Sequence, residues 1–393
     1  MQVPDGFRRS VVRKISRCNL IGNRPVIPHD TLPQTVVRHA VRQIEHLDKN
    51  RVEKRILDMK TKSLLLLICF FIDFISSSVF AQVVQRDTAI VSQSARLETV
   101  FSGGINTEGP AAALDGSIFF VDVPISQLHD SVTAGRIWRF DHQTGKSTVY
   151  RSPSGKAIGL KFDAEGRMVV AEFADFGGRR ITRTDLATGK AEIIAALFQG
   201  KPFNGPNDLT IDEKGRIYFT DYGYNAPHEV IYHRGDGVYR IDPKGTIERI
   251  INHAGKPNGI AISPDQKTIY IASNQLDIFG TSAILAYDLS NDGKVVFRSI
   301  FEQFEPNTVL PDGMTFDTEG NLYVALFSRI ARTGVVVYSP KGKEIAFIPT
   351  PERAKNVAFG RGNESNLLYI TAGKSLYRIS VTKTGYQLPP IQR

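Results

Sequence analysis

The sequence repeats one short design along most of its length. A polar residue able to bind a metal lies at a Pro/Gly corner, and a strand-turn-strand pattern follows it. The clearest copies begin with the tripeptides Glu108-Gly109-Pro110, Pro206-Asn207-Asp208, Pro257-Asn258-Gly259 and Pro311-Asp312-Gly313. Two weaker copies cover 158–172 and 356–372. The six copies follow one another at intervals of about 50 residues, which is typical of a repeat architecture.

The repeat predicts an all-β fold. Each hairpin is followed by another strand pattern, as at 135–141, 237–242 and 375–380. Short alternating strands in a long internal repeat indicate a six-bladed β-propeller with four-stranded blades. A β-sandwich is disfavoured because the repeats share register as well as composition. A propeller must protect the edge between its first and last blades, so 95–101 is expected to pair into the blade that contains 375–380.

The residues before the repeats predict an export signal. Residues 59–81 hold a Met, two lysines, an apolar run from Leu64 to Ile72 and the sequence Val79-Phe80-Ala81. This order is typical of a signal peptide cleaved after Ala81, and the apolar run is too short to span a membrane as a helix. We therefore expect a periplasmic or secreted protein, whose functional domain is a propeller over 82–393.

Residues 1–58 form a basic N-terminal extension, with 12 Lys and Arg against 6 Asp and Glu. One interpretation is an arm that binds nucleic acid or a membrane. The favoured interpretation is an over-extended start with Met59 as the initiator, because a secretion signal works at an N-terminus. The extension is not expected in the mature protein.

Removing residues 1–81 changes what the charge implies. The whole chain has a net charge of +9. Residues 1–81 contain 14 basic and 7 acidic residues, so 82–393 retain 35 basic and 33 acidic residues. A domain so close to neutrality lacks the basic footprint of a nucleic-acid-binding protein. Both cysteines, Cys18 and Cys69, also lie in the part expected to be removed.

The repeated polar positions predict a metal site. The innermost strand of each propeller blade lines the central channel, so the residues that begin these strands should form a ring at one mouth. The ring positions are Glu108, Ile158, Asn207, Asn258, Asp312 and Asn356. We expect Glu108, Asn207, Asn258 and Asp312 to bind one divalent cation. Ligation by oxygen alone favours Ca²⁺, with Mg²⁺, Mn²⁺ or Zn²⁺ as alternatives.

Each tripeptide taken alone is an ordinary turn sequence. Their common register favours a shared site. Four protein ligands would leave coordination positions for water or substrate, as in a catalytic centre. Asn207 and Asn356 are predicted substrate contacts. His228 is a third, because it lies in the long insertion 222–237 that could overhang the channel mouth.

The sequence also resembles a known family. The segments 203–221, 256–274, 310–325 and 356–360 are similar to the senescence-marker-protein/gluconolactonase/regucalcin-like family, and chiefly to its exported bacterial gluconolactonase type. The resemblance covers roughly 95–380. It implies a six-bladed propeller with one catalytic divalent cation held by Glu108, Asn258 and Asp312. Asn207 would complete the shell or contact substrate, and the typical activity is hydrolysis of sugar lactones.

Three positions depart from the pattern that the resemblance implies. Ile158 stands where family members often have Asn, and Gly205 where regucalcin-type members have Arg. The segment Asp221-Tyr222-Gly223-Tyr224 replaces a common Asp-Pro-Arg-Tyr. These changes leave the predicted metal ligands intact and bear on the substrate.

The preferred functional hypothesis is a metal-dependent lactonase in which Asp312 is both metal ligand and general base. One alternative is an organophosphate or aryl-ester hydrolase that uses the same site. The other is a non-catalytic ligand-binding propeller in which Ca²⁺ is structural. The expected partner is a small lactone, with no nucleic acid and no membrane after signal cleavage, and the protein is expected to be a monomer or homodimer.

Overall fold

The computed structural model describes residues 89–126, 133–224, 226, 228–274, 282–305, 308–328 and 332–388. These residues belong to one compact unit, Val83–Arg393. The predicted extension (1–58) and signal peptide (59–81) lie outside the described residues. Within the described part of the chain, no helix is long and apolar enough to cross a membrane.

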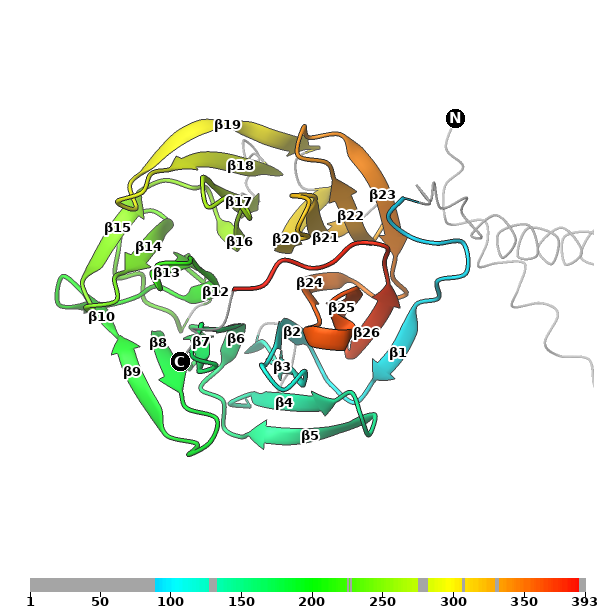
Figure 1. Ribbon diagram of the computed structural model, residues 1–393. Helices are drawn as coiled ribbons and strands as arrows, with labels where there is room; N and C mark the ends of the chain where they lie inside the picture. The colour runs from blue at the N-terminus through cyan, green and yellow to red at the C-terminus, as the bar shows by residue number, and fades with distance from the viewer. Residues whose placement is uncertain are drawn as a thin grey trace, which may run out of the picture. The chain divides into compact units, whose positions relative to one another are not determined.

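Six four-stranded antiparallel sheets surround a central channel (Figure 1). This arrangement confirms the predicted six-bladed β-propeller. From the inner strand outward, the first blade contains β2 (Thr107–Ala112), β3 (Ile118–Asp122), β4 (Arg136–Asp141) and β5 (Lys146–Arg151). The second blade contains β6 (Ala157–Phe162), β7 (Met168–Glu172), β8 (Arg180–Thr184) and β9 (Ala191–Ala195). The third blade contains β12 (Pro206–Ile211), β13 (Ile217–Asp221), β14 (Gly237–Ile241) and β15 (Ile247–Ile251).

The fourth blade contains β16 (Pro257–Ile262), β17 (Thr268–Asn274), β18 (Ser282–Leu289) and β19 (Val295–Phe304). The fifth blade contains β20 (Val309–Phe316), β21 (Leu322–Ser328), β22 (Gly334–Tyr338) and β23 (Glu344–Pro349). A small hairpin of β10 (Leu197–Phe198) and β11 (Lys201–Pro202) links the second blade to the third.

The sixth blade joins the two ends of the fold. It contains β24 (Ala354–Phe359), β25 (Leu367–Ala372), β26 (Ser375–Ser380) and, as its outer strand, β1 (Glu98–Phe101). A short 3₁₀ turn, η2 (Gly362–Glu364), lies between β24 and β25. β1 pairs antiparallel with β26, so the expected closure by 95–101 is confirmed (Figure 1).

The turns between first and second strands explain the repeated sequence pattern. Asp212 accepts hydrogen bonds from the amides of Lys214 and Arg216 at 3.0 and 2.9 Å, and Asp317 does the same for Glu319 and Asn321. A glycine follows each of these aspartates and adopts a positive φ, which an L side chain rarely tolerates. The Asp-x-x-Gly spacing therefore encodes the hairpin turn.

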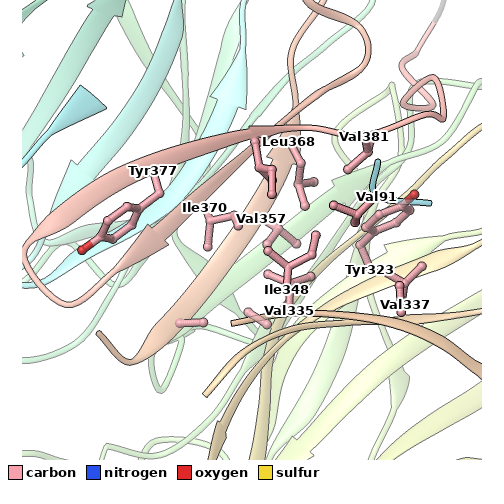
Figure 2. Packing of buried hydrophobic residues seen from close by; sticks show 14 of the residues in the cluster. Val91, Tyr323, Val335, Val337, Ile348, Val357, Leu368, Ile370, Tyr377 and Val381 are labelled. Atoms are coloured by element: carbon pink, nitrogen blue, oxygen red, sulfur yellow. The ribbon is translucent and has the colours of Figure 1, made fainter. Parts of the chain in front are cut away.

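The core consists of apolar clusters between neighbouring blades. Figure 2 shows the cluster between the fifth and sixth blades. Tyr323 and Val335 from the fifth blade meet Val357 and Ile370 from the sixth, and Val91 from the segment before β1 packs with them. Second strands such as β3, β7 and β13 are buried along their whole length, so both of their faces pack against neighbouring blades and join them around the channel.

The chain after β26 crosses the centre of the propeller at one mouth of the channel (Figure 1). Tyr386, Gln387 and Leu388 line a cavity together with residues at the ends of the inner strands, including Phe162 and Phe359. The amide of Tyr386 donates to the carbonyl of Phe316 at 2.9 Å. The ring positions begin the inner strands, so they lie at the opposite mouth.

Candidate metal centre

Every inner strand is irregular at or next to its ring residue. The pairing between first and second strands shifts register between Glu108 and Ala111 in the first blade and between Pro311 and Met314 in the fifth, and the other four blades behave alike. Inner strands are the edges of their sheets, where proline and bulges are tolerated. A bulge re-aims a side chain, so these irregularities turn the ring residues away from the regular ladder.

Buried aspartates at the ends of second strands hold the loops that enter the ring. Asp122 accepts hydrogen bonds from the amides of Ile105 and Asn106 at 2.8 and 2.9 Å. Asp221 accepts from the amides of Asn204 and Gly205 at 3.1 and 2.6 Å. The two carboxylates thus fix the approach to Glu108 and Asn207.

Glycines bring neighbouring ring residues together. A Cβ at Gly259 would lie 2.1 Å from the carbonyl oxygen of Asp312, and one at Gly313 would lie 2.0 Å from the Cγ of Asn356. Neither position has room for a side chain. The inner strands of adjacent blades therefore approach each other at the ring, as a shared ligand site requires.

Glu108 and Asp312 are buried and close enough to influence each other's charge. The ammonium group of Lys355 lies 3.2 Å from Oε1 of Glu108. Burial raises the pKa of Glu108 to about 8, against the opposing charge of Lys355, and the charge of Asp312 adds to the rise. Burial also raises the pKa of Asp312, opposed by Lys355 and Arg353. The ring thus contains two carboxylates that a nearby cation would stabilise.

The amide ring residues connect to these carboxylates. Asn258 makes a side-chain hydrogen bond to Asp312. Nδ2 of Asn207 donates to the hydroxyl of Tyr222 at 3.3 Å. Burial and the charges of Asp312 and Glu108 raise the pKa of Tyr222, so its phenol stays protonated. Direct or electrostatic contacts therefore connect the four predicted metal ligands, and Tyr222 takes part in these contacts.

Asn356 is buried and faces a third carboxylate. Its Oδ1 accepts a hydrogen bond from the amide of Val357 at 2.8 Å, and its Nδ2 lies 3.5 Å from Oδ2 of Asp208. Burial raises the pKa of Asp208, and Lys161 opposes the rise. With one oxygen held by the backbone, Asn356 offers less to a ligand than its ring position suggested. Its proposed contact with substrate stays a prediction.

Sequence reasoning missed Asp208, Tyr222 and Lys355. Asp208 had a signal, because four other copies of the motif have glycine at the corresponding position: Gly109, Gly159, Gly259 and Gly313. Tyr222 lies in the segment that departs from the family pattern. Lys355 directly precedes a ring residue, but nothing in the repeat distinguishes a channel-facing lysine from a solvated one.

His228 lies in a separate group with Asp175 and Glu229. Its Nε2 is 3.2 Å from Asp175 and 3.4 Å from Glu229, and its ring stacks on Phe176. No hydrogen bond or ion pair within the described residues joins His228 to the ring. The predicted substrate contact by His228 stays a prediction.

The carboxylates of this group already have cationic partners. Asp175 pairs with the buried Lys156 at 3.1 Å, and Glu229 pairs with Arg179. Because these charges are balanced within the protein, the group needs no metal. It ties the insertion after β13 to the second blade.

Comparison with known proteins gives a family for this geometry. The description "SMP-30/Gluconolactonase/LRE-like region" matches residues 106–374, which include every ring position. The chain belongs to this family. A gluconolactonase of Zymomonas mobilis is 27% identical over 317 residues, covering 76% of this chain and 85% of that protein. A lactonase of Staphylococcus epidermidis is 27% identical over 257 residues, covering 64% of this chain and 71% of that protein.

Solved structures agree with the fold of this family member. A gluconolactonase of Xanthomonas campestris superposes with a TM-score of 0.64 at 29% identity, covering 75% of this chain and 91% of that one. A regucalcin of Agrobacterium tumefaciens, described as calcium-binding, gives a TM-score of 0.60 at 18% identity and covers 76% of this chain and 98% of that one. At that identity the regucalcin supports the shared propeller only.

The donor set fits a hard divalent cation. Glu108 and Asp312 supply carboxylate oxygens, and Asn207 and Asn258 supply amide oxygens. Thiol and imidazole groups are absent from the ring as the structure describes it. Oxygen donors of this kind favour Ca²⁺ or Mg²⁺ over softer metals.

Proposed function

We propose that this protein is a metal-dependent lactonase of the gluconolactonase kind. The observation that carries the proposal is the buried pair Glu108 and Asp312 at the channel mouth, in a chain of the SMP-30/gluconolactonase family. The relatives at 26–29% identity that support it include proteins named gluconolactonase and lactonase.

Glu108, Asn207, Asn258 and Asp312 would hold the cation, which we propose to be Ca²⁺. When bound, the cation polarises the lactone carbonyl and stabilises negative charge that develops on it. Its presence would also keep both carboxyl groups ionised, because it supplies the positive charge that burial denies them.

Asp312 is the proposed general base. Its carboxylate is buried in the ring beside Glu108, and once ionised it can accept a proton from a water molecule there. Asn258 donates a hydrogen bond to it and so holds its orientation. Ring opening then needs a proton on the departing ring oxygen, and the protonated Asp312 can return the proton it took.

Tyr222 and Asn207 would orient the substrate. The phenol of Tyr222 stays protonated and lies beside both the carboxylates and the amide of Asn207. A protonated hydroxyl in this place can donate a hydrogen bond to a sugar lactone. The loop that carries it differs from the family pattern, so this contact bears on which lactone fits.

A substrate panel tests the proposal. Purified protein is assayed with gluconolactone, an aryl lactone and paraoxon, before and after EDTA treatment and after Ca²⁺ is restored. We expect lactone hydrolysis that EDTA abolishes and Ca²⁺ restores. Faster turnover of paraoxon would favour the organophosphate hydrolase, and no turnover of any substrate would favour the non-catalytic binding propeller.

A further inference from the structure

Two basic residues precede the last ring position. Lys355 and Arg353 lie at the start of β24 and in the loop before it. The side chain of Lys355 is only 12% exposed and its ammonium group reaches Glu108. The guanidinium of Arg353 lies 4.4 Å from the ring centroid of Phe327. Its charge lowers the pKa of both Glu108 and Asp312.

The charged groups that face one another across the described ring already balance. The acids are Glu108, Asp208 and Asp312. Lys355 and Arg353 oppose the pair Glu108 and Asp312, whereas Lys161, which lines the cavity at the opposite mouth, opposes Asp208. Asp236 and Lys256 form a further opposed pair beside Tyr222. A site built only to hold a divalent cation would need the two carboxylates and no lysine, because two carboxylates neutralise the ion.

A divalent cation therefore leaves the mouth with two surplus positive charges. Surplus charge in a buried site is costly unless a partner of opposite sign neutralises it. Glu108 would share its charge with the cation, which weakens its hold on Lys355. The ammonium group of Lys355 then becomes available to an anion in the channel.

We propose that the substrate is a lactone with an anionic substituent, a carboxylate or a phosphate, and that Lys355 binds that substituent. The inference rests on the proposed lactonase function and names its substrate class. Arg353 would add to the attraction from the rim. A lysine is suited to either anion, since its ammonium acts as a point charge with three donors.

The test compares substrates that share a skeleton. Glucono-lactone is neutral, glucaro-lactone carries a carboxylate, and 6-phosphoglucono-lactone carries a phosphate. For the wild type we expect kcat/KM to be at least about tenfold higher for one of the anionic lactones than for the neutral one. Charged hydrogen bonds support ratios of about 10 to 100. Whichever anionic lactone is favoured identifies the substituent.

Variants assign the preference to Lys355. Lys355→Met should lower the anionic-to-neutral ratio at least about tenfold, chiefly through KM, and Lys355→Arg should retain most of it. Lys343→Met is the matched control. Lys343 is exposed on the turn before β23, and its loss removes the same charge without touching the channel. The control should leave the ratio unchanged.

A binding measurement gives a readout that is independent of turnover. Calorimetry compares glucaro-lactam with glucono-lactam, which the enzyme does not hydrolyse, in Ca²⁺-loaded protein. The wild type should bind the carboxylated lactam more tightly, and Lys355→Met should lose that advantage. Equal losses for both lactams, or no preference in the wild type, would overturn the inference while lactonase activity stood. Failure to hydrolyse any lactone would refute the proposed function itself.

Discussion

The ammonium group of Lys355 lies 3.2 Å from the carboxylate of Glu108, although 247 positions separate the two residues in the chain. One comes from the inner strand of the first blade and the other from the inner strand of the last. The contact exists because β1 completes the sixth blade and brings the first and last blades side by side. Closure of the propeller therefore also completes the electrostatic environment of the candidate metal centre.

Cation affinity should rise with pH. Burial raises the pKa of Glu108 to about 8, and the pKa of Asp312 is raised too. Below their pKa values these groups hold protons that a cation must displace. If Glu108 alone titrates, the affinity for the cation should rise roughly tenfold per pH unit up to about pH 8 and level off above it. Calorimetric titration with Ca²⁺ at about pH 6, 7, 8 and 9 measures this slope. An affinity independent of pH would contradict the raised pKa of Glu108.

The same shift predicts how stability changes when no cation is present. The folded-state pKa of Glu108 is above its ordinary value of 4.5, so the folded protein binds more protons than the unfolded chain between 4.5 and about 8. Glu108 therefore contributes stability that is fully present below pH 4.5 and is lost as pH rises through about 8. Thermal unfolding in EDTA should show this loss for the wild type. In Glu108→Gln the loss across this window should be smaller.

Gly313 should be essential for the approach of the fifth and sixth blades. A Cβ there would lie 2.0 Å from the side chain of Asn356, so Gly313→Ala forces the inner strands apart. We expect a loss of about 1–3 kcal/mol in the free energy of unfolding, together with weaker cation binding. Gly103→Ala is the control, because its new Cβ would meet only the ring of Phe101 at 3.2 Å. Denaturant unfolding of both variants checks the difference.

Much of this architecture could be predicted from sequence because it is repeated. The hairpin pattern recurs six times, the Asp-x-x-Gly turn occurs in three of the copies and a Pro/Gly corner in five, and each copy supports the register of the others. The contacts of Lys355 and Tyr222 occur once. Their direction depends on the bulges and on one irregular insertion, and a repeat pattern contains no information about features that only one blade has.

His228 illustrates the same limit. The insertion 222–237 could be recognised as long and unusual, but its conformation depends on the pairing of Lys156 with Asp175 and of Arg179 with Glu229. These partners are far apart in sequence and no periodicity connects them. Tertiary charge pairing of this kind can be seen only in the folded chain.

Export is also testable. We propose that the signal at 59–81 is cleaved after Ala81, so exported protein should begin at Gln82. N-terminal sequencing of the exported form, expressed from the full chain, gives the answer directly. A control with Ala81→Arg should block cleavage at this position and leave the uncleaved form in the membrane fraction. A mature protein that starts before residue 59 would refute both the signal and the proposed start at Met59.

Paired substitutions should separate proton transfer from metal binding. Asp312→Asn keeps an oxygen ligand of nearly the same shape but removes a charge and a base. Glu108→Gln keeps an oxygen and removes only the charge. If Asp312 takes the proton from water, Asp312→Asn should reduce kcat by a factor of about 10²–10⁴ even at saturating Ca²⁺. Glu108→Gln should instead weaken Ca²⁺ binding, and excess Ca²⁺ should restore part of its activity. Activity measured against Ca²⁺ concentration distinguishes the two.

Equal rescue of both variants would mean that Asp312 is a ligand only, and Asp208 would then be the carboxylate to test as the base. Full activity in both would remove the site and leave a binding propeller.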